Sequence, residues 1–472
     1  MSAVHFSWTE LLSLTNGQWL LPPAECTAQA GVHGVSDDSR QTTRGSLFIA
    51  IAGEIADGHH FLPQAIAAGA GAVCLERAPA AEILRQMRAS CCPCLQVPDS
   101  LAAFQTLARA HGRKFPGLRI LGITGSCGKT STKEMCAAVL EQRWPGQVLK
   151  TLGNTNNHYG LPRNLLRLDH SHRLAVLEMG SNHPGEIAHL STLAPPSVGL
   201  VCNIGSAHLE FFHDLSGVAT EKGDLLAATA ADGIAIFPAE PPGREILEKK
   251  AGRRQRITFG SSAAADVRCE YLGPATEGQT ALRLSWRDRR EVQEFCWKIG
   301  GAHQALNAAA AAAAGTAFGL TAAEIVAGLQ HCTLPGQRME ILEREGIVWA
   351  NDAYNANPDS AAAALAWFAE VSRAASRRII ILGDMRELGD LAPQAHLHLL
   401  QQARVAFPEA EIICVGTLMA APAQAFQLAH YPDVDTLLQG LPAKFPPHTW
   451  ILLKASNGVK LYTLPDRRQA SR

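Results

Sequence analysis

The segment from Ile123 to Ser131, ITGSCGKTS, constrains the fold of this chain more than any other. It follows the apolar run 118–124 and precedes residues 130–142, whose apolar side chains recur at helical spacing. Glycines at 125 and 128 allow backbone N–H groups to turn toward phosphate oxygens, and the start of a helix adds a favourable dipole. This order of strand, loop and helix predicts an α/β fold. The alternative interpretation is a glycine-rich turn with an incidental lysine.

The loop predicts a nucleoside triphosphate ligand with Mg²⁺. Lys129 would neutralise charge on the β- and γ-phosphates, and the Thr130 hydroxyl is a candidate Mg²⁺ ligand. Ile123 stands where the full motif carries a glycine, so the loop is of a shorter TGxxGKT form. The residues predicted to contact the nucleotide here are Gly125, Ser126, Cys127, Gly128, Lys129, Thr130 and Ser131. The loop alone does not indicate which reaction is catalysed.

A chain of 472 residues is too long for one ordinary domain and suits about three. Breaks at Phe115-Pro-Gly and Leu334-Pro-Gly predict domains over 1–115, 116–334 and 335–472. A net charge near −1 gives no indication of nucleic-acid binding. We expect no signal peptide and no membrane span, because neither pattern occurs.

Twelve cysteines in a chain of this length are typical of reduced thiols, which predicts a cytoplasmic protein. Cys91, Cys92 and Cys94 cluster in CCPC, where a metal site and a small-residue strand are the two interpretations. The second is favoured, because paired ligand spacing is missing.

Strands and helices alternate from residue 118 onward, as in a mostly parallel sheet. Segment 253–299 is more polar and alternating, which predicts a small antiparallel excursion. After residue 336, four apolar runs with helices between them predict a doubly wound, Rossmann-like domain. These runs are 346–352, 377–384, 411–417 and 450–456.

Three ionisable residues follow the phosphate loop at informative places. Glu178 ends a buried strand and His208 follows another, at the edge where parallel sheets bind ligands. Glu178 could hold a divalent cation against the phosphates. Lys222 lies on an expected helix. Taken singly, each has an ordinary explanation: a surface ion pair, a hydrogen-bonded histidine and a solvated lysine.

Taken together, these segments resemble the Mur ligase family over residues 36 to 456. In the first domain, SDDSR (36–40) and the run from Gly45 to Phe61 are similar to the family's UDP-sugar-binding segment, which implies substrate contacts from Ser39 and Arg40. GNTNNHYGLP (153–162) is similar to a segment of the family's D-alanyl-D-alanine-adding branch, which implies substrate contacts from Asn154, Asn156 and Asn157.

The resemblance also implies roles for the ionisable residues. Glu178 matches a magnesium ligand, His208 a second-magnesium histidine, and Lys222 a lysine that the family carries carbamylated. Asn307 matches an adenine contact, although Gln304 replaces the usual asparagine beside it. We therefore expect Lys129, Glu178, His208 and Lys222 to be catalytic, and Thr130, Glu178, His208 and carbamylated Lys222 to bind Mg²⁺.

Two motifs of the last domain point to the same branch. DAYNANPDS (352–360) and GDMRELG (383–389) are similar to its DxYNANPxS and GDMxELG segments. They imply nucleotide contacts from Asp352 and substrate contacts from Tyr354, Asn355 and Asn357. Arg338 resembles the arginine of PGRxE, with an extra residue, Gln337, inserted before it.

The end of the chain departs from this pattern. Lys454-Ala-Ser-Asn457 replaces KGSR, so the arginine is missing, and we expect the closing helix to be lost.

The resemblance implies a monomeric ligase that joins D-alanyl-D-alanine to UDP-N-acetylmuramoyl-tripeptide, with ATP and Mg²⁺, through an acyl phosphate. A sibling ligase that adds another amino acid and a catalytically silent nucleotide-binding homologue are the alternatives. A P-loop motor or switch ATPase is not favoured, because such a protein would not explain the first domain.

Overall fold

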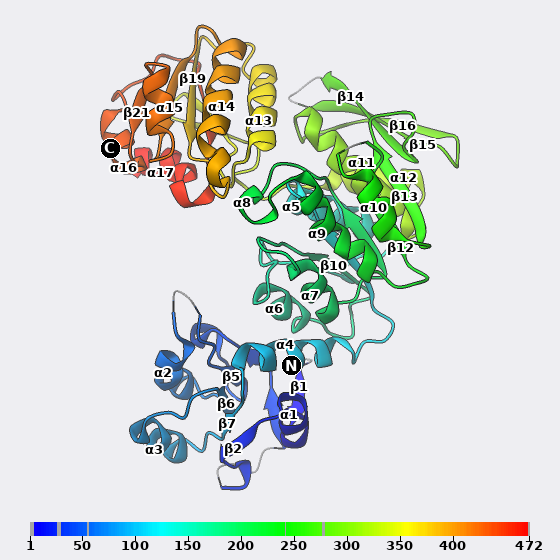
Figure 1. The fold of residues 1–472 in the computed structure, drawn as a ribbon, viewed down its shortest axis with the longest axis vertical. Helices are drawn as coiled ribbons and strands as arrows, with labels where there is room; N and C mark the ends of the chain where they lie inside the picture. The colour runs from blue at the N-terminus through cyan, green and yellow to red at the C-terminus, as the bar shows by residue number, and fades with distance from the viewer. Residues whose placement is uncertain (1–3, 26–29, 54–55, 241, 276–278, 471–472) are drawn as a thin grey trace.

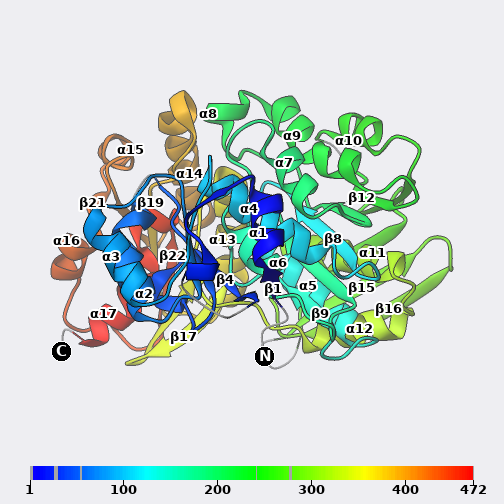
Figure 2. The same ribbon diagram turned by 90° about the horizontal axis from the view of Figure 1, so that it is seen from below.

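The computed structural model describes residues 4–25, 30–53, 56–240, 242–275 and 279–470. These residues form three lobes, each built around its own β-sheet (Figure 1). The N-terminal lobe is blue, the central lobe mainly green, and the C-terminal lobe orange to red. Seen from below, the N-terminal lobe lies in front of the C-terminal lobe and of the middle of the molecule (Figure 2). None of the helices in the described part of the chain combines the length and apolar character needed to cross a bilayer.

The N-terminal lobe contains a five-stranded sheet in the order β2-β7-β6-β5-β4, and only β2 runs antiparallel to its neighbour. Strands β5 and β6 are buried along their whole length, which explains their continuous apolar sequence. Its elements are β1 (His5–Ser7), α1 (Trp8–Thr15), β2 (Gln18–Leu21), β3 (Gly31–His33), β4 (Val35–Ser36), η2 (Ser39–Gln41), β5 (Leu47–Ile49), η3 (Gly58–Phe61), α2 (Leu62–Ala67), β6 (Ala72–Leu75), α3 (Ala81–Ala89), β7 (Cys94–Gln96) and α4 (Ser100–Gly112). Of the CCPC cluster, Cys92 and Cys94 are buried in the apolar core of this lobe, and Cys91 is exposed.

The central lobe contains a nine-stranded sheet in the order β16-β15-β14-β13-β12-β11-β8-β10-β9. Its elements are β8 (Arg119–Thr124), α5 (Lys129–Glu141), β9 (Val148–Lys150), α6 (Gly160–Leu165), β10 (Leu174–Glu178), α7 (Glu186–Leu193), β11 (Val198–Val201), α8 (Leu209–Phe212), α9 (Leu215–Ala228), β12 (Ile234–Pro238), α10 (Arg244–Ala251), β13 (Gln255–Gly260), β14 (Val267–Pro274), β15 (Thr280–Trp286), β16 (Glu291–Trp297), α11 (Ala302–Ala317) and α12 (Ala322–His331). Strand β8 pairs in parallel with β10 on one side and β11 on the other. The strand order therefore reverses at β8, and ligands of open α/β sheets bind at such a switch point.

The expected antiparallel excursion is shorter than the polar segment that suggested it. Strand β13 pairs in parallel with β12, and the antiparallel pairing begins between β14 and β15. Helix α10 connects β12 to β13, so β13 completes another β-α-β unit despite its polar start. All of these strands belong to the same sheet as the phosphate loop.

Helix α11 crosses the interior of the central lobe. Its alanines from Ala308 to Ala314 are at most 1% exposed, so this part of the helix is enclosed on every side. They pack in one apolar cluster with Leu121 and Ile123 of β8 and with Val139 of α5. Small side chains allow helix and sheet to approach closely, and this places the start of α11 beside the phosphate loop.

The C-terminal lobe contains a six-stranded sheet in the order β17-β18-β22-β19-β20-β21, parallel except for β17. The predicted α/β class, the mostly parallel central sheet and the Rossmann-like last unit are confirmed. Its elements are β17 (Glu340–Arg344), β18 (Ile347–Asn351), α13 (Pro358–Val371), β19 (Arg377–Gly383), η5 (Gly389–Leu391), α14 (Ala392–Ala406), β20 (Glu411–Val415), α15 (Ala420–Ala425), β21 (Ala429–Tyr431), α16 (Val434–Gly440), β22 (Thr449–Lys454), η6 (Asn457–Val459), η7 (Leu461–Thr463) and α17 (Leu464–Ala470).

The expectation that the closing helix is lost is wrong. After β22 the chain makes two short 3₁₀ turns and then forms α17. The turns place Leu461 and Leu464 in the apolar cluster beneath the sheet, where neither side chain is exposed. Two apolar anchors in a polar stretch are too few to produce a recognisable helical pattern.

Candidate active site

The phosphate loop has the geometry that its sequence predicts. Gly125 and Gly128 have φ angles of +149° and +74°, and Gly128 precedes the first residue of α5. A side chain at Gly128 would clash with the Asn307 side chain on α11, because its Cβ would lie 2.6 Å from Oδ1. Glycine is thus required here for close approach as well as for backbone conformation.

The loop is anchored to the segment that follows β11. Asn203 Oδ1 accepts a hydrogen bond of 3.0 Å from the Cys127 N–H. The Ser126 hydroxyl donates to the Gly205 carbonyl at 3.0 Å and accepts from the Gly205 N–H at 2.9 Å. Lys129 Nζ donates to the Gly125 carbonyl at 2.7 Å, within the loop itself.

Glu178 lies at the carboxyl end of β10 and is 1% exposed. Its backbone N–H donates to Thr151 Oγ1 at 2.9 Å, and its Oε1 accepts from Asn156 Nδ2 at 2.7 Å. Its other carboxylate oxygen, Oε2, is buried and has no hydrogen-bond partner among the described residues. A buried, unpaired carboxylate oxygen next to a phosphate loop is suited to a divalent cation.

His208 meets the C-terminal lobe. Its backbone is left-handed, with a φ angle of +54°, and its Nδ1 lies 2.7 Å from Glu387 Oε2 of GDMRELG. This contact lowers the pKa of the Glu387 carboxyl. Two motifs that are far apart in sequence therefore touch at the site.

Lys222 is buried on α9, with 1% of its surface exposed. Its Nζ donates to the Ser181 hydroxyl at 2.7 Å and to the Ser181 carbonyl at 3.2 Å. Burial, together with the positive charge of Lys129, lowers the pKa of the Lys222 ammonium to about 7. A substantial fraction of the amine, about half at pH 7, is therefore neutral and nucleophilic.

Arg338 reaches from the C-terminal lobe to the phosphate loop. Its guanidinium Nη2 donates to Thr130 Oγ1 at 3.3 Å and stacks on the Tyr354 ring, 3.7 Å from the ring centroid. Gln337 and Met339 on either side both have left-handed backbones, with φ angles of +67° and +52°. The inserted Gln337 is thus accommodated in a tight bend that presents Arg338 to the loop.

Asp352 and Lys454 form an ion pair at the carboxyl ends of β18 and β22, in which the lysine is buried and the aspartate half-buried. Lys454 Nζ lies 2.6 Å from Asp352 Oδ2, and Asp352 Oδ1 accepts from the Met339 N–H at 3.1 Å. Nearby, burial lowers the pKa of His303 to about 4. Lys454 is the part of the altered KASN segment that enters the site.

Four of the asparagines predicted to contact substrate differ in what their side chains bind: one holds the Glu178 carboxylate, and the other three bind nearby backbone N–H groups. Asn156 holds Glu178, whereas Asn157 Oδ1 accepts the Gly160 N–H at 2.9 Å and shapes its own loop. Asn357 caps α13 by accepting the Ser360 N–H at 2.8 Å, so it organises local structure. Asn355 Oδ1 accepts from the next backbone N–H, that of Ala356, at 2.9 Å.

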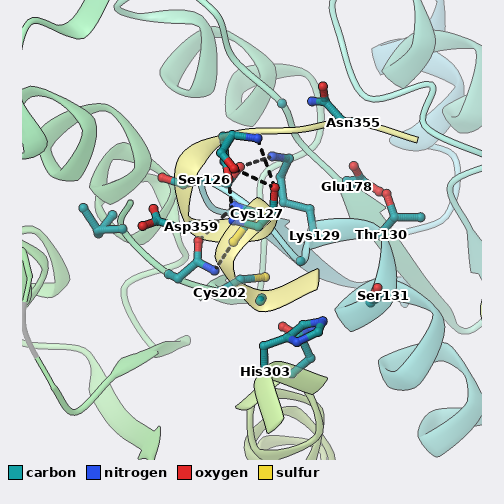
Figure 3. Close-up of a pocket in the computed structure, with 18 of the residues that line it drawn as sticks. Ser126, Cys127, Lys129, Thr130, Ser131, Glu178, Cys202, His303, Asn355 and Asp359 are labelled. Atoms are coloured by element: carbon teal, nitrogen blue, oxygen red, sulfur yellow. Dashed lines mark hydrogen bonds between the residues drawn. The ribbon is translucent and has the colours of Figure 1, made fainter. Parts of the chain in front are cut away.

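One cavity of about 630 Å³ brings together most of the residues that the sequence analysis singled out. Its walls include Ser126, Cys127, Gly128, Lys129, Thr130, Ser131, Asn154, Asn156, Asn157, Glu178, His208, Asn307, Arg338, Asp352, Tyr354, Asn355 and Asn357. Figure 3 shows residues of the loop and of its surroundings, among them Glu178, Asn355 and Asp359, facing this cavity. Gly125 and Lys222 are not in its surface but hold or adjoin residues that are.

Ser39 and Arg40 lie apart from this cavity, in the N-terminal lobe. Ser39 Oγ donates to Gln64 at 2.8 Å, and the exposed Arg40 guanidinium pairs with Asp38. The preceding Asp37 binds Arg163 of the central lobe through both carboxylate oxygens, at 2.8 and 2.7 Å. This segment therefore lies at the junction of two lobes.

Sequence reasoning assigned no role to several residues that build the site. Asn203 follows β11, and it could have been predicted in the same way as Glu178, because side chains at the carboxyl ends of parallel strands lie at the ligand-binding edge of the sheet. Asp359 was recognised only as part of a motif, yet its Oδ2 accepts the Ser206 N–H at 2.9 Å and joins two lobes. Ser181 and Lys133 gave no sequence signal, because their contacts depend on helix packing.

Comparison with known proteins agrees with this arrangement. Residues 123–315 match the Mur ligase middle domain, residues 337–457 the Mur ligase glutamate ligase domain, and residues 31–111 the Mur ligase family catalytic domain. The UDP-N-acetylmuramoyl-tripeptide–D-alanyl-D-alanine ligase of Bacillus subtilis (strain 168) is 34% identical over 447 residues, covering 92% of this chain and 92% of the relative.

Solved structures give the same result. MurF from Acinetobacter baumannii has a TM-score of 0.85 at 28% identity and covers 100% of both chains. MurF ligase from Thermotoga maritima, in complex with ADP, has a TM-score of 0.78 at 25% identity and covers 93% of this chain and 97% of that one. The chain belongs to the Mur ligase family.

Proposed function

We propose that this chain is an ADP-forming ligase that joins D-alanyl-D-alanine to UDP-N-acetylmuramoyl-tripeptide, using ATP, in the synthesis of peptidoglycan precursors. The observation that carries this proposal is the single cavity shared by the phosphate loop, Glu178 and the YNANP segment of the C-terminal lobe. The named relatives supply the substrate pair, since they are tripeptide–D-alanyl-D-alanine ligases aligned over nearly the whole chain.

A carboxylate does not condense with an amine in water without activation. In the proposed reaction the γ-phosphoryl group of ATP passes to the terminal carboxylate of the tripeptide, which forms an acyl phosphate and ADP. The amine of D-alanyl-D-alanine then attacks the acyl carbon, and phosphate leaves. Positioning and charge neutralisation supply most of the catalysis in such a reaction.

The phosphate loop and Lys129 would bind and neutralise the phosphates of ATP. Lys129 Nζ now donates to the Gly125 carbonyl and would exchange this bond for phosphate oxygens. Asn307 and Arg338 would contact the nucleotide from α11 and from the C-terminal lobe, with Asp352 behind Arg338.

Thr130 and Glu178 fit a Mg²⁺ site. The donors are a hydroxyl and a buried carboxylate with one unpaired oxygen, which is the oxygen chemistry that Mg²⁺ prefers. No group of three or more His, Cys, Asp or Glu side chains in the described ranges is placed to hold a metal by itself. When bound, Mg²⁺ would supply positive charge against the phosphate oxygens.

His208 and Lys222 would complete a second Mg²⁺ site if Lys222 is carbamylated. The lowered pKa of Lys222 supports this step, because only a neutral amine reacts with CO₂. Ser181 holds Lys222 Nζ through two hydrogen bonds and so fixes the reacting atom.

The three lobes suggest a division of labour. The N-terminal lobe, with Ser39 and Arg40, would bind the UDP-sugar, the central lobe ATP, and the C-terminal lobe the dipeptide through Tyr354, Asn355 and Asn357. Asn154, Asn156 and Asn157 would lie between them, near the reacting carboxylate. Water must be kept from the acyl phosphate, and the contacts of Arg338, Asp359 and Glu387 across the cavity serve to close it.

The decisive experiment measures phosphate release from ATP with UDP-N-acetylmuramoyl-tripeptide, with and without D-alanyl-D-alanine, and determines the product mass. We expect release that requires both substrates and a product with the mass of the UDP-pentapeptide. Release with a different amino acid instead would make the chain a sibling ligase. ATP binding without release for any acceptor would make it a silent homologue and would refute the proposal.

A further inference from the structure

Lys133 is a fully buried lysine outside the cavity, one helical turn after Lys129 on α5. Its ammonium Nζ donates to the carbonyls of Thr151 at 2.9 Å and Gly153 at 2.8 Å. Glu134 Oε1 lies 2.9 Å away as the third acceptor. An ammonium group has three N–H donors, so the side chain is satisfied without substrate or water.

The carbonyls that Lys133 binds belong to the loop that surrounds Glu178. The Thr151 hydroxyl accepts the Glu178 N–H at 2.9 Å, and the Thr151 N–H donates to the Val176 carbonyl at 3.0 Å. Further along the same loop, Asn156 Nδ2 donates to Glu178 Oε1 at 2.7 Å. The loop therefore contacts both the backbone and the carboxylate of Glu178.

We propose that Lys133 is a positioning residue that fixes the 151–157 loop and thereby directs the free Glu178 carboxylate oxygen toward the bound cation. This rests on the cation-binding role of Glu178 in the proposed function. Lys133 is not among the residues that line the cavity, and it contacts the loop at the carbonyls of Thr151 and Gly153. The loop in turn contacts Glu178 through the Thr151 hydroxyl and Asn156. Groups that orient a metal ligand from behind typically change metal affinity about 10- to 100-fold when they are removed.

Lys150 provides a matched control. It pairs with Glu134 from the opposite, solvent side, and 47% of its side chain is exposed. Lys133→Met and Lys150→Met remove the same charge from the same glutamate, but only Lys133→Met releases the loop carbonyls. An effect of charge or of the Glu134 ion pair would appear in both variants.

The test measures ADP binding calorimetrically, once with excess MgCl₂ and once with EDTA, so it is independent of ligase activity. For Lys133→Met we expect unchanged ADP affinity in EDTA and about a 10- to 100-fold loss of the increase that Mg²⁺ produces. Lys150→Met should retain this increase. If the Lys133→Met protein is less heat-stable but Mg²⁺ still increases its ADP affinity as in the unmodified protein, Lys133 has a purely structural role. That result would overturn the proposal.

A second variant covers the case in which Lys133→Met fails to fold. Thr151→Val keeps the side-chain shape and removes the hydroxyl that accepts the Glu178 N–H. It should lose the Mg²⁺-dependent increment to a similar degree, whereas an unchanged increment would overturn the proposal. The unmodified protein separates the two hypotheses: Mg²⁺-dependent ADP binding without ligation would refute the proposed function but leave the Lys133 test valid.

Discussion

Carbamylation of Lys222 can be tested directly, with a magnitude that follows from its environment. Burial lowers the pKa of this ammonium from 10.5 to about 7. At pH 7.5 an amine with a pKa of about 7 is roughly three-quarters neutral, whereas at a pKa of 10.5 only about one molecule in a thousand is neutral. The neutral nitrogen attacks CO₂, a C–N bond forms, and a proton is released. The reactive neutral fraction of Lys222 is therefore several hundredfold larger than that of a surface lysine.

The assay is ¹³C NMR of the protein in ¹³C-bicarbonate. We expect one carbamate resonance that is lost in Lys222→Met and retained in Lys249→Met, which changes an exposed lysine. The resonance should weaken as the pH falls below about 7, because the amine becomes protonated and the carbamate decomposes. A resonance of equal strength in Lys222→Met, or none in the unmodified protein at mildly alkaline pH, would refute this reasoning.

The same shift in pKa links Lys222 to stability. Between about pH 7 and 10.5 the unfolded chain holds the Lys222 proton and the folded chain has released it. The free energy of unfolding should therefore rise with pH in this window, by up to about 1.4 kcal/mol per pH unit from this group alone. In CO₂-free buffer, denaturant unfolding of Lys222→Met should lack this contribution, and parallel pH profiles of the two proteins would contradict the shift.

Three further changes test other parts of the site. Lys129→Met should lower the single-turnover rate of phosphoryl transfer at saturating ATP by about 10²- to 10³-fold, because it removes a preorganised charge from the transferring group; a loss below tenfold would place the lysine outside the reaction. Glu178→Gln keeps the shape but removes the charge, so the Mg²⁺ concentration for half-maximal activity should rise by at least about tenfold, and an unchanged Mg²⁺ requirement would exclude Glu178 as a ligand. Lys454→Met removes the ion-pair partner of the half-buried Asp352 and should destabilise the protein by up to roughly 3 kcal/mol in thermal unfolding, and the double variant with Asp352→Asn should be less destabilised than the single one.

The parts of the site that follow from the sequence depend on the topology of a parallel sheet. Once a strand leads into the phosphate loop, the carboxyl ends of neighbouring strands must meet beside it. Glu178 and His208 were predicted on this basis, and both line the same cavity as Lys129. The Rossmann-like last lobe followed from its apolar runs in the same way.

The parts that could not be predicted depend on how helices pack. Lys222 was singled out only through the family resemblance, and its burial against Ser181 could not be predicted, because it depends on the packing of α9 against α7. Lys133 of α5 is likewise a buried lysine whose burial cannot be predicted from the sequence. Helix α17 was missed because two buried leucines anchor it rather than a periodic face.

The buried alanine run of α11 is a segment in which we expect most amino-acid substitutions to destabilise the protein. Residues 308–314 are enclosed on all sides and do not line the active-site cavity, yet each added methyl or larger group would force neighbouring elements apart, at about 1–3 kcal/mol per substitution. In a saturation mutagenesis scan with cell growth as the readout, substitutions in this alanine run should therefore reduce growth as strongly as substitutions in the phosphate loop. Positions intolerant of substitution would therefore include both the buried α11 alanines and the catalytic residues. Only a binding or rate measurement would distinguish residues needed for folding from residues needed for catalysis.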